Sequence, residues 1–191
     1  MNKKLYFRWI ETSLGISIVS WQNDKLVSFT LPRKKRETAL LHFIRQCEFL
    51  SASPHEEKND PFTLEEPIQK YFEGQIVSFV SYPFSLEFYP PFTRKVLEKT
   101  ALIPYGTTRT YGEIARAIGM PRACRAVGQS LGKNLLPLFI PCHRVIAQNS
   151  LGGFGEGLWM KVLLLSIELS NFTPHFLRQG ALQKNTHPLV E

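Results

Sequence analysis

Apolar and polar residues alternate over the first third of the chain, in the pattern that β-strands show. In "GISIVSW" two isoleucines alternate with Ser17 and Val19, and the turn-rich stretch "QNDK" separates this run from "LVSFTL". The pattern predicts a β-hairpin over residues 14–31, preceded by a strand at "LYFRWI".

After the basic run "RKKR", the apolar spacing changes to that of a helix. Residues 37–50 carry apolar side chains at intervals of three and four, namely Leu40, Leu41, Ile44 and Cys47. We therefore expect a helix here, with Cys47 facing the core as a packing residue. The stretch "SASPHEEKNDP" that follows is polar, contains two prolines and has no period, which is typical of a surface loop.

A further helix and strand complete the expected N-terminal domain. The spacing predicts a helix over residues 64–73 that ends at Gly74, and "IVSFVSYPF" predicts a strand. The proline-containing "FYPPF" then marks a joint, so residues 1–90 are expected to form one α/β domain. Residues 91–170 contain successive helical segments and form the expected second domain, whereas residues 171–191 show no period and are expected to be a tail.

The segment "RTYGEIARAIGMPRACRAVGQSLGKN" carries the signals of two short helices. Thr110 and Glu113 form a capping box, and Gly119 supplies a C-terminal stop. Pro121 suits the first position of the next helix, which Gly132 ends. The apolar faces are Tyr111, Ile114, Ala115 and Ile118 in the first helix, and Ala123, Val127 and Leu131 in the second. Two short helices joined by about three residues indicate a helix-turn-helix.

Basic and polar side chains gather on one face of the second helix. They recur at intervals of three and four, as Arg122, Arg125, Gln129 and, just past the end, Lys133. Other positions are small, including Ala126 and Gly128, which lets the helix backbone approach a duplex closely. A solvated basic surface is the alternative, and the small residues favour a DNA-contacting helix. Cys124 lies among them and is expected to be a packing residue.

Composition limits the classes of binding partner and the cellular compartment that fit this chain. The 191 residues carry a formal net charge of +7 and a sequence pI near 9.4, which favours a polyanionic partner. The three cysteines form no CxxC pair, so we expect free thiols in a reducing compartment and neither a disulfide framework nor a metal site. The N-terminus lacks the apolar core of a signal peptide, and no apolar run reaches the roughly 18 residues of a membrane span. We expect a cytoplasmic protein that does not contact membranes.

The stretch "FIPCHRVIAQNSLGGFGEG" contains the main candidate for chemistry, Cys142 beside His143. A free thiol is only slightly ionised at pH 7, so a nucleophilic cysteine needs a proton acceptor, and His143 is the candidate. Adjacent side chains point apart in regular structure, so a bridging water or a tight turn would be needed. Glu168 lies on an otherwise apolar helix face, where a carboxylate needs a partner such as a histidine. A relay of these three residues is one of several options, which include a cysteine hydrolase and a buried structural cysteine.

Taken together, these motifs resemble one protein family. "IPYGTTRTYGEIARAIGMPRACRAVGQSLGKN", followed by "IPCHRVI" and the loop "GGFG", is similar to the O6-alkylguanine-DNA alkyltransferases. The similarity covers residues 92–168, and "PCHRV" with "RAVG" at this separation is its specific signature. Residues 1–90 match more loosely, through "YFEG" and the strand pattern. The resemblance implies an α+β fold, with a ribonuclease-H-like N-terminal domain and a helical C-terminal domain that carries the helix-turn-helix.

The resemblance also implies a role for each matching residue. Cys142 would accept the alkyl group, His143 would activate it through a water, and Glu168 would orient the histidine. Arg125 would enter the duplex and fill the gap left by a flipped nucleotide. Tyr111 would crowd the target phosphate and form a hydrogen bond with the guanine edge.

Further positions follow from the same resemblance. Asn134 would tie the recognition helix to the active-site segment. In this family the second helix enters the minor groove, where further contacts would come from Arg122, Gln129, Lys133, Ala126 and Gly128. The substrate pocket would be lined by Pro141, Val145, Gly153, Phe154, Gly155 and Glu156.

The implied activity is DNA repair by irreversible transfer of the alkyl group from O6-alkylguanine to Cys142, once per molecule and after nucleotide flipping. O4-alkylthymine is left open as a further substrate. No cofactor is implied, and we expect a monomer whose partner is double-stranded DNA. The alternative is a helix-turn-helix DNA-binding regulator in which the cysteine is structural.

The sequence departs from the family pattern at two points. The zinc site of some N-terminal domains is missing, because Cys47 is the only cysteine before Cys124, and no metal is expected. Glu156 stands at a lip position that is usually uncharged, which leaves the breadth of substrates open. Its side chain lies either in the pocket lip or in solvent.

Overall fold

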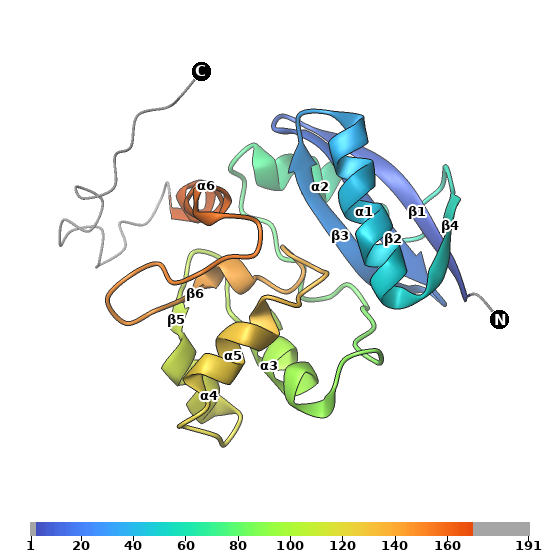
Figure 1. The fold of residues 1–191 in the computed structure, drawn as a ribbon. Coiled ribbons are helices and arrows are strands. Elements are labelled where there is room, and N and C mark those ends of the chain that lie inside the picture. The colour runs from blue at the N-terminus through green and yellow to red at the C-terminus, as the bar shows by residue number, and fades with distance from the viewer. Residues whose placement is uncertain (1–2, 170–191) are drawn as a thin grey trace.

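The computed structural model describes residues 3–169, so the tail expected over residues 171–191 lies outside the described residues. A four-stranded sheet and a set of helices confirm the α+β class (Figure 1). In chain order the elements are β1 (Lys3–Thr12), β2 (Gly15–Gln22), β3 (Lys25–Arg33), α1 (Arg36–Leu50), β4 (Ala52–Glu56), α2 (Glu65–Phe72), α3 (Pro91–Ala101), β5 (Arg109–Thr110), α4 (Tyr111–Ala117), α5 (Cys124–Leu131), the 3-10 helix η1 (Cys142–Arg144), β6 (Val145–Ile146) and α6 (Leu158–Leu169).

The predicted hairpin is present and belongs to a sheet with strand order β3-β2-β1-β4. β2 pairs antiparallel with both β1 and β3. Asn23 and Asp24 connect β2 to β3 with φ angles of 49° and 54°, the left-handed conformation that a two-residue hairpin turn requires. The "QNDK" signal therefore encodes this turn directly.

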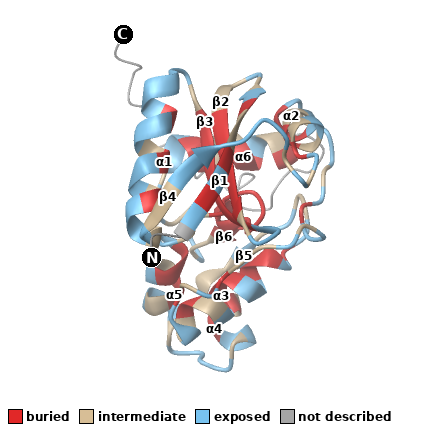
Figure 2. Ribbon diagram, turned by 90° about the vertical axis from the view of Figure 1, so that its right-hand side faces the viewer, coloured by how far each residue is buried: buried red, intermediate tan, exposed pale blue. Residues whose placement is uncertain are grey.

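Both faces of the central strand are covered, as the red strands in Figure 2 show. Ile18 points into a cluster with Phe43 of α1, whereas Val19 points to the opposite face and joins the larger core. On that second face, Phe29 packs edge-on against Phe139 with ring centroids 5.7 Å apart. The sheet thus carries α1 on one face and the helical C-terminal half on the other (Figure 1).

Helix α1 is present, but the expected buried face is wrong in part. Its core positions are Ala39, Phe43 and Cys47, spaced four residues apart, so the prediction for Cys47 is confirmed. The other expected core residues are partly or largely exposed, at 37%, 57% and 39% for Leu40, Leu41 and Ile44. The small side chain of residue 39 lets the helix lie close to the sheet, where the phenylalanine ring fills the interface.

Two predictions between residues 51 and 84 are wrong. The expected surface loop contains β4, which pairs parallel with β1 through backbone groups while its side chains stay exposed or half-buried. Among residues 3–169, the expected strand "IVSFVSYPF" has no sheet partner beyond one bridge between Leu26 and Phe84. Phe79 of this segment is buried in the core, so its apolar residues anchor a loop. The helix expected over 64–73 is confirmed as α2.

The helical half begins at the predicted joint, because Pro91 occupies the first turn of α3. The capping box of Thr110 and Glu113 opens α4 as predicted. The second helix, α5, begins at Cys124, so placing Pro121 at its first position is wrong. Residues 120–123 form a turn instead, in which the Ala123 N–H donates to the Met120 carbonyl at 2.9 Å. No helix within residues 3–169 is long and apolar enough to cross a membrane.

Candidate active site

The candidate nucleophile lies in a single helical turn behind a proline. Cys142, His143 and Arg144 form η1, directly after Pro141, and all three side chains are buried. Cys142 keeps 8% of its surface exposed, while His143 is fully buried. The side chain of Cys142 therefore reaches the surface, whereas that of His143 lies in the interior.

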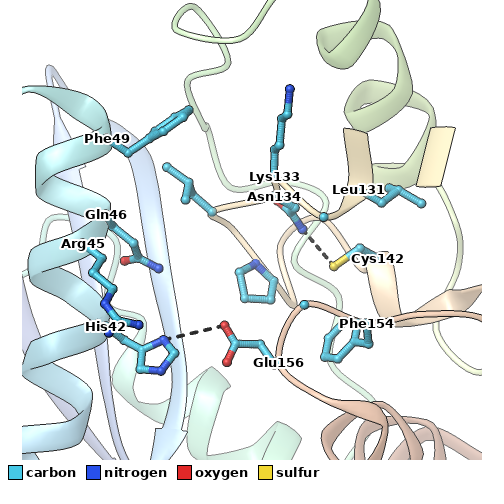
Figure 3. A pocket seen from close by; sticks show the side chains of 14 residues that line it. His42, Arg45, Gln46, Phe49, Leu131, Lys133, Asn134, Cys142, Phe154 and Glu156 are labelled. Atoms are coloured by element: carbon cyan, nitrogen blue, oxygen red, sulfur yellow. Dashed lines mark hydrogen bonds and ion pairs between the residues drawn. The ribbon is translucent and has the colours of Figure 1, made fainter. Parts of the chain in front are cut away.

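Asn134 ties the residues after α5 to this turn. Its Nδ2 donates to Cys142 Sγ at 3.1 Å and to the Ile140 carbonyl at 2.8 Å, and its Oδ1 accepts from the Leu136 N–H at 3.0 Å. Figure 3 shows the contact between the amide and the sulfur. An amide donor at this distance favours the thiolate over the thiol.

His143 and Glu168 are joined as the relay requires. His143 Nε2 lies 2.7 Å from Glu168 Oε1, and both side chains are buried. A carboxylate accepts, so Nε2 carries the proton and Nδ1 keeps its lone pair. His143 Nδ1 has no hydrogen-bond partner in the part of the chain that the structure describes. This nitrogen is therefore available as a proton acceptor.

Glu168 accepts from more groups than the sequence suggested. Arg144 donates Nε to Oε2 at 2.8 Å and Nη2 to Oε1 at 2.9 Å. Tyr71 of α2 donates its hydroxyl to Oε1 at 2.7 Å, and the Gly106 N–H lies 3.2 Å from Oε2. Arg144 and Tyr71 stand in the motifs "PCHRV" and "YFEG", but the sequence alone assigns neither of them a role.

Burial and charge set the protonation states of the relay. Burial raises the pKa of Cys142. Burial is also the main cause that lowers the pKa of His143. The charges of Arg144 and Lys161 act on that pKa in the same direction, and the Glu168 carboxylate acts against them. Burial alone would raise the pKa of Glu168 also, but hydrogen bonds and charges from His143 and Arg144 bring it to about 2. The resting pair is therefore a neutral thiol and a neutral imidazole beside an ionised carboxylate.

A buried lysine, Lys161 of α6, was not found by sequence reasoning. Its Nζ donates to the Val145 carbonyl at 2.6 Å and to the Gly153 carbonyl at 3.2 Å. Burial lowers the pKa of Lys161 to about 8, and its positive charge lowers the pKa of Cys142. The sequence signal that could have revealed this residue is a single lysine within the apolar helix "LWMKVLLLSIEL".

Tyr111 lies over the glycine loop, by which we mean residues 151–157. Its hydroxyl lies 3.3 Å from the Gly153 carbonyl, to which it donates. A Cβ added at Gly152 would come within 2.7 Å of the Tyr111 ring, and Gly152 has a φ of +69°. Only glycine fits at that position without moving the ring.

A cavity of about 360 Å³ opens beside the sulfur of Cys142. Figure 3 shows it between α1 on one side and η1 with the glycine loop on the other. Of the expected pocket residues, Phe154, Gly155 and Glu156 line it, together with Asn134 and Lys133. The other expected residues do not line it: Pro141 borders a second cavity, Val145 is fully buried and Gly153 turns its carbonyl to Tyr111 and Lys161.

Glu156 is held by the N-terminal half of the chain. Its carboxylate pairs with Arg33 at the end of β3. It also lies 4.0 Å from His42 Nδ1 of α1, as the dashed line in Figure 3 shows. The side chain is 26% exposed, so a position in free solvent is wrong. Four residues of α1 complete the far wall of the cavity: His42, Arg45, Gln46 and Phe49.

The expected basic face is exposed. Its members are Arg122, Arg125, Gln129 and Lys133, of which two lie within α5 and the other two flank it. The small residues Ala126 and Gly128 are half-buried, and a Cβ at Gly128 would lie 3.6 Å from Tyr111. Cys124 is exposed, so the expectation that it packs in the interior is wrong. Within residues 3–169, no cluster of three His, Cys, Asp or Glu side chains could hold a metal ion.

Comparisons with known proteins agree on one family. A family model described as "6-O-methylguanine DNA methyltransferase, DNA binding domain" matches residues 91–170. A constitutive methylated-DNA–protein-cysteine methyltransferase of Bacillus subtilis (strain 168) is 36% identical over 165 residues, which cover 85% of this chain and 94% of the relative. A relative with the same enzyme name from Methanosarcina barkeri is 43% identical over 172 residues, which cover 87% and 99%. The crystal structure of Mycobacterium tuberculosis OGT in complex with DNA is similar with a TM-score of 0.70 and 30% identity, covering 90% of this chain and 97% of that one.

Proposed function

The chain belongs to the family of methylated-DNA–protein-cysteine methyltransferases, and from this membership we propose that it transfers an alkyl group from O6-alkylguanine in double-stranded DNA to Cys142 Sγ. The observation that carries the proposal is the arrangement of four side chains. Cys142 lies at the mouth of a cavity with its sulfur held by Asn134, and the adjacent His143 is oriented by a carboxylate.

The proton route follows from the tautomer of His143. Its Nε2–H donates to Glu168, so the free Nδ1 accepts the proton of the Cys142 thiol, through a water because no direct hydrogen bond joins the two side chains in the described structure. The imidazolium that forms is stabilised by the buried carboxylate. Asn134 and Lys161 stabilise the thiolate.

The transfer itself is an in-line displacement. The thiolate forms a bond to the alkyl carbon, the bond from that carbon to O6 breaks, and guanine leaves with the electron pair. A proton is then returned to guanine, and Tyr111 is placed over the glycine loop to donate a hydrogen bond to it. The product is a thioether without a good leaving group, so each molecule reacts once.

The base must leave the duplex before it can react. We propose that α4 and α5 act as a helix-turn-helix, with α5 in the minor groove and its small residues allowing close approach. Arg125, which is exposed on α5, would fill the gap in the base stack. This offsets part of the extrusion cost of a few kcal/mol.

The finer organisation is part of the same proposal. Residues 1–90 would form a ribonuclease-H-like domain that supports the site through α1 and α2, and residues 91–170 would form the reacting domain. The protein would act as a monomer in the cytoplasm. The proposal leaves open whether O4-alkylthymine is also a substrate.

The test is the mass of the peptide that contains Cys142. After incubation with a duplex containing O6-methylguanine, this peptide should gain one methyl group, and the duplex should lose one. A Cys142→Ser variant should bind the duplex equally well and transfer nothing, because the same histidine cannot ionise a hydroxyl. A DNA-binding regulator would bind the duplex and stay unmodified, and that result would overturn the proposal.

A further inference from the structure

Tyr71 reaches the relay from outside the reacting half of the chain. It lies on α2, its side chain is fully buried, and its hydroxyl donates to Glu168 Oε1 at 2.7 Å. The ring is fixed by edge contacts to Phe72 and Tyr105, with centroids 5.3 Å and 6.1 Å away. The hydroxyl therefore has little freedom to turn toward another partner.

The oxygen that Tyr71 contacts is the one that orients the histidine. Glu168 Oε1 accepts from the Tyr71 hydroxyl, from His143 Nε2 at 2.7 Å and from Arg144 Nη2 at 2.9 Å. The Tyr71 oxygen also lies 3.5 Å from His143 Nε2. Each donor stabilises the ionised carboxylate and makes the oxygen less basic, so each of the three weakens the hold of that oxygen on the other two.

We propose that Tyr71 is a positioning residue of the relay, whose hydroxyl occupies Glu168 Oε1 and so limits how strongly the carboxylate holds the Nε2 proton of His143. The proposal rests on the function proposed above. It assigns a part in the alkyl transfer to the N-terminal half of the chain, through a side chain that does not touch the cysteine.

The proposal predicts the direction in which the pH dependence of the transfer rate should shift. Without the Tyr71 hydroxyl, Oε1 carries more charge toward His143, and the imidazolium form is stabilised. An imidazolium has no free Nδ1 lone pair and cannot accept the proton of Cys142. The acidic limb of the transfer rate should therefore move to higher pH. The charged and titratable groups that act on this histidine or on the carboxylate beside it are Glu168 and Lys161 from α6, Arg144 from η1, Tyr71 from α2, and Tyr105.

The expected shift in a Tyr71→Phe variant is about half to one pH unit, since one donor of several to a charged oxygen is lost. On the acidic limb this lowers the transfer rate about three- to tenfold. The matched control is Tyr105→Phe, which removes a hydroxyl that donates to the Ile167 carbonyl at 3.3 Å and forms no hydrogen bond with Glu168 in the described residues. Burial raises the pKa of Tyr105, so this hydroxyl is uncharged throughout the assay and its loss changes no charge near the carboxylate. That variant should keep the profile of the wild type.

The experiment measures two quantities in the full chain. One is the single-turnover rate of methyl transfer from duplex O6-methylguanine between pH 5 and 8. The other is the titration of the His143 ring by NMR in the free protein, which needs no substrate and also reports whether each variant is folded. A Glu168→Gln background completes the design, because Tyr71 should have no effect on the histidine once the carboxylate is gone.

The result that supports the proposal is an upward shift in both measurements for Tyr71→Phe, none for Tyr105→Phe, and none from Tyr71→Phe in the Glu168→Gln background. A His143 titration that is unchanged, that moves to lower pH, or that shifts equally without the carboxylate would overturn it. A wild type that leaves Cys142 unmodified would contradict the proposed function alone, because the NMR titration tests Tyr71 independently.

Discussion

Replacing Glu168 by glutamine should remove a buried negative charge that is paired with Arg144 and hydrogen-bonded to His143. The carboxylate is surrounded only by donors, from Tyr71, His143, Arg144 and the Gly106 N–H. A glutamine offers one oxygen and one NH2 group, so its NH2 would face donors and at least two hydrogen bonds would be lost. The Arg144 guanidinium, only 6% exposed, would remain without its counter-charge.

The magnitude follows from the pKa of Glu168. Its fall from an ordinary 4.5 to about 2 corresponds to about 3 kcal/mol of stabilisation of the folded state. Removing one partner of a buried ion pair costs about 3–5 kcal/mol, which agrees. Glu168→Gln should therefore lower the free energy of unfolding by about 3 kcal/mol at pH 7.

The pH dependence has a fixed sign. Because the folded state lowers the pKa of Glu168, the stabilisation is complete above about pH 4.5 and is lost as pH falls toward 2. The difference between wild type and variant should shrink as pH falls below about 4.5, because protonated glutamate resembles glutamine.

Urea unfolding followed by tryptophan fluorescence measures this difference at each pH. The control is Glu66→Gln, which removes an exposed ion pair with Lys70 on α2 and should leave the unfolding midpoint unchanged. A difference for Glu168→Gln below about 1 kcal/mol at pH 7, or one that persists unchanged at pH 3, would refute the reasoning.

Three further predictions concern the reaction and its surroundings. Lys161→Met should slow methyl transfer about tenfold at pH 7, because the lysine charge lowers the pKa of Cys142. The variant should also lose any fall in rate near pH 8, where the lysine itself loses its charge; a wild-type pH–rate profile would contradict this. Arg125→Ala should slow repair in a duplex at least about tenfold more than reaction with the free modified base, since only the duplex requires extrusion; equal losses would leave Arg125 as a phosphate contact. Glu156→Gln breaks the ion pair with Arg33 and should raise amide hydrogen exchange in the glycine loop about fivefold, and unchanged exchange would show that the loop is held by other contacts.

Local signals in the sequence were sufficient for several elements. The alternation before and after "QNDK" gave the hairpin, since both strands and their turn are neighbours in the chain. The capping box at Thr110 gave the start of α4, because its hydrogen bonds close within three residues. The motifs around Cys142 likewise identified the family, and the proposed nucleophile, its histidine and Asn134 were named from the resemblance.

Other features depended on partners far away in the sequence. The buried face of α1 is decided by the sheet on which it packs. Phe43 is buried against that sheet, whereas Leu40, Leu41 and Ile44 of the same helix stay exposed. β4 exists because the edge of β1 offers unpaired backbone groups, which no side-chain pattern reveals. The segment around Phe79 has the composition of a strand but lies over the core without a strand to pair with.

The features of the site likewise divide into those that the sequence named and those that only the folded structure decided. The sequence alone, through the family resemblance of its motifs, named the residues that are proposed to carry the chemistry, because motifs record residue types at short spacing. Only the tertiary structure placed Tyr71 on Glu168, across 97 positions, and Arg33 on Glu156, across 123. It also buried Lys161 beside Cys142. Contacts of that kind arise when the sheet and the helical half pack together, and their energy comes from burial and charge that no local pattern specifies.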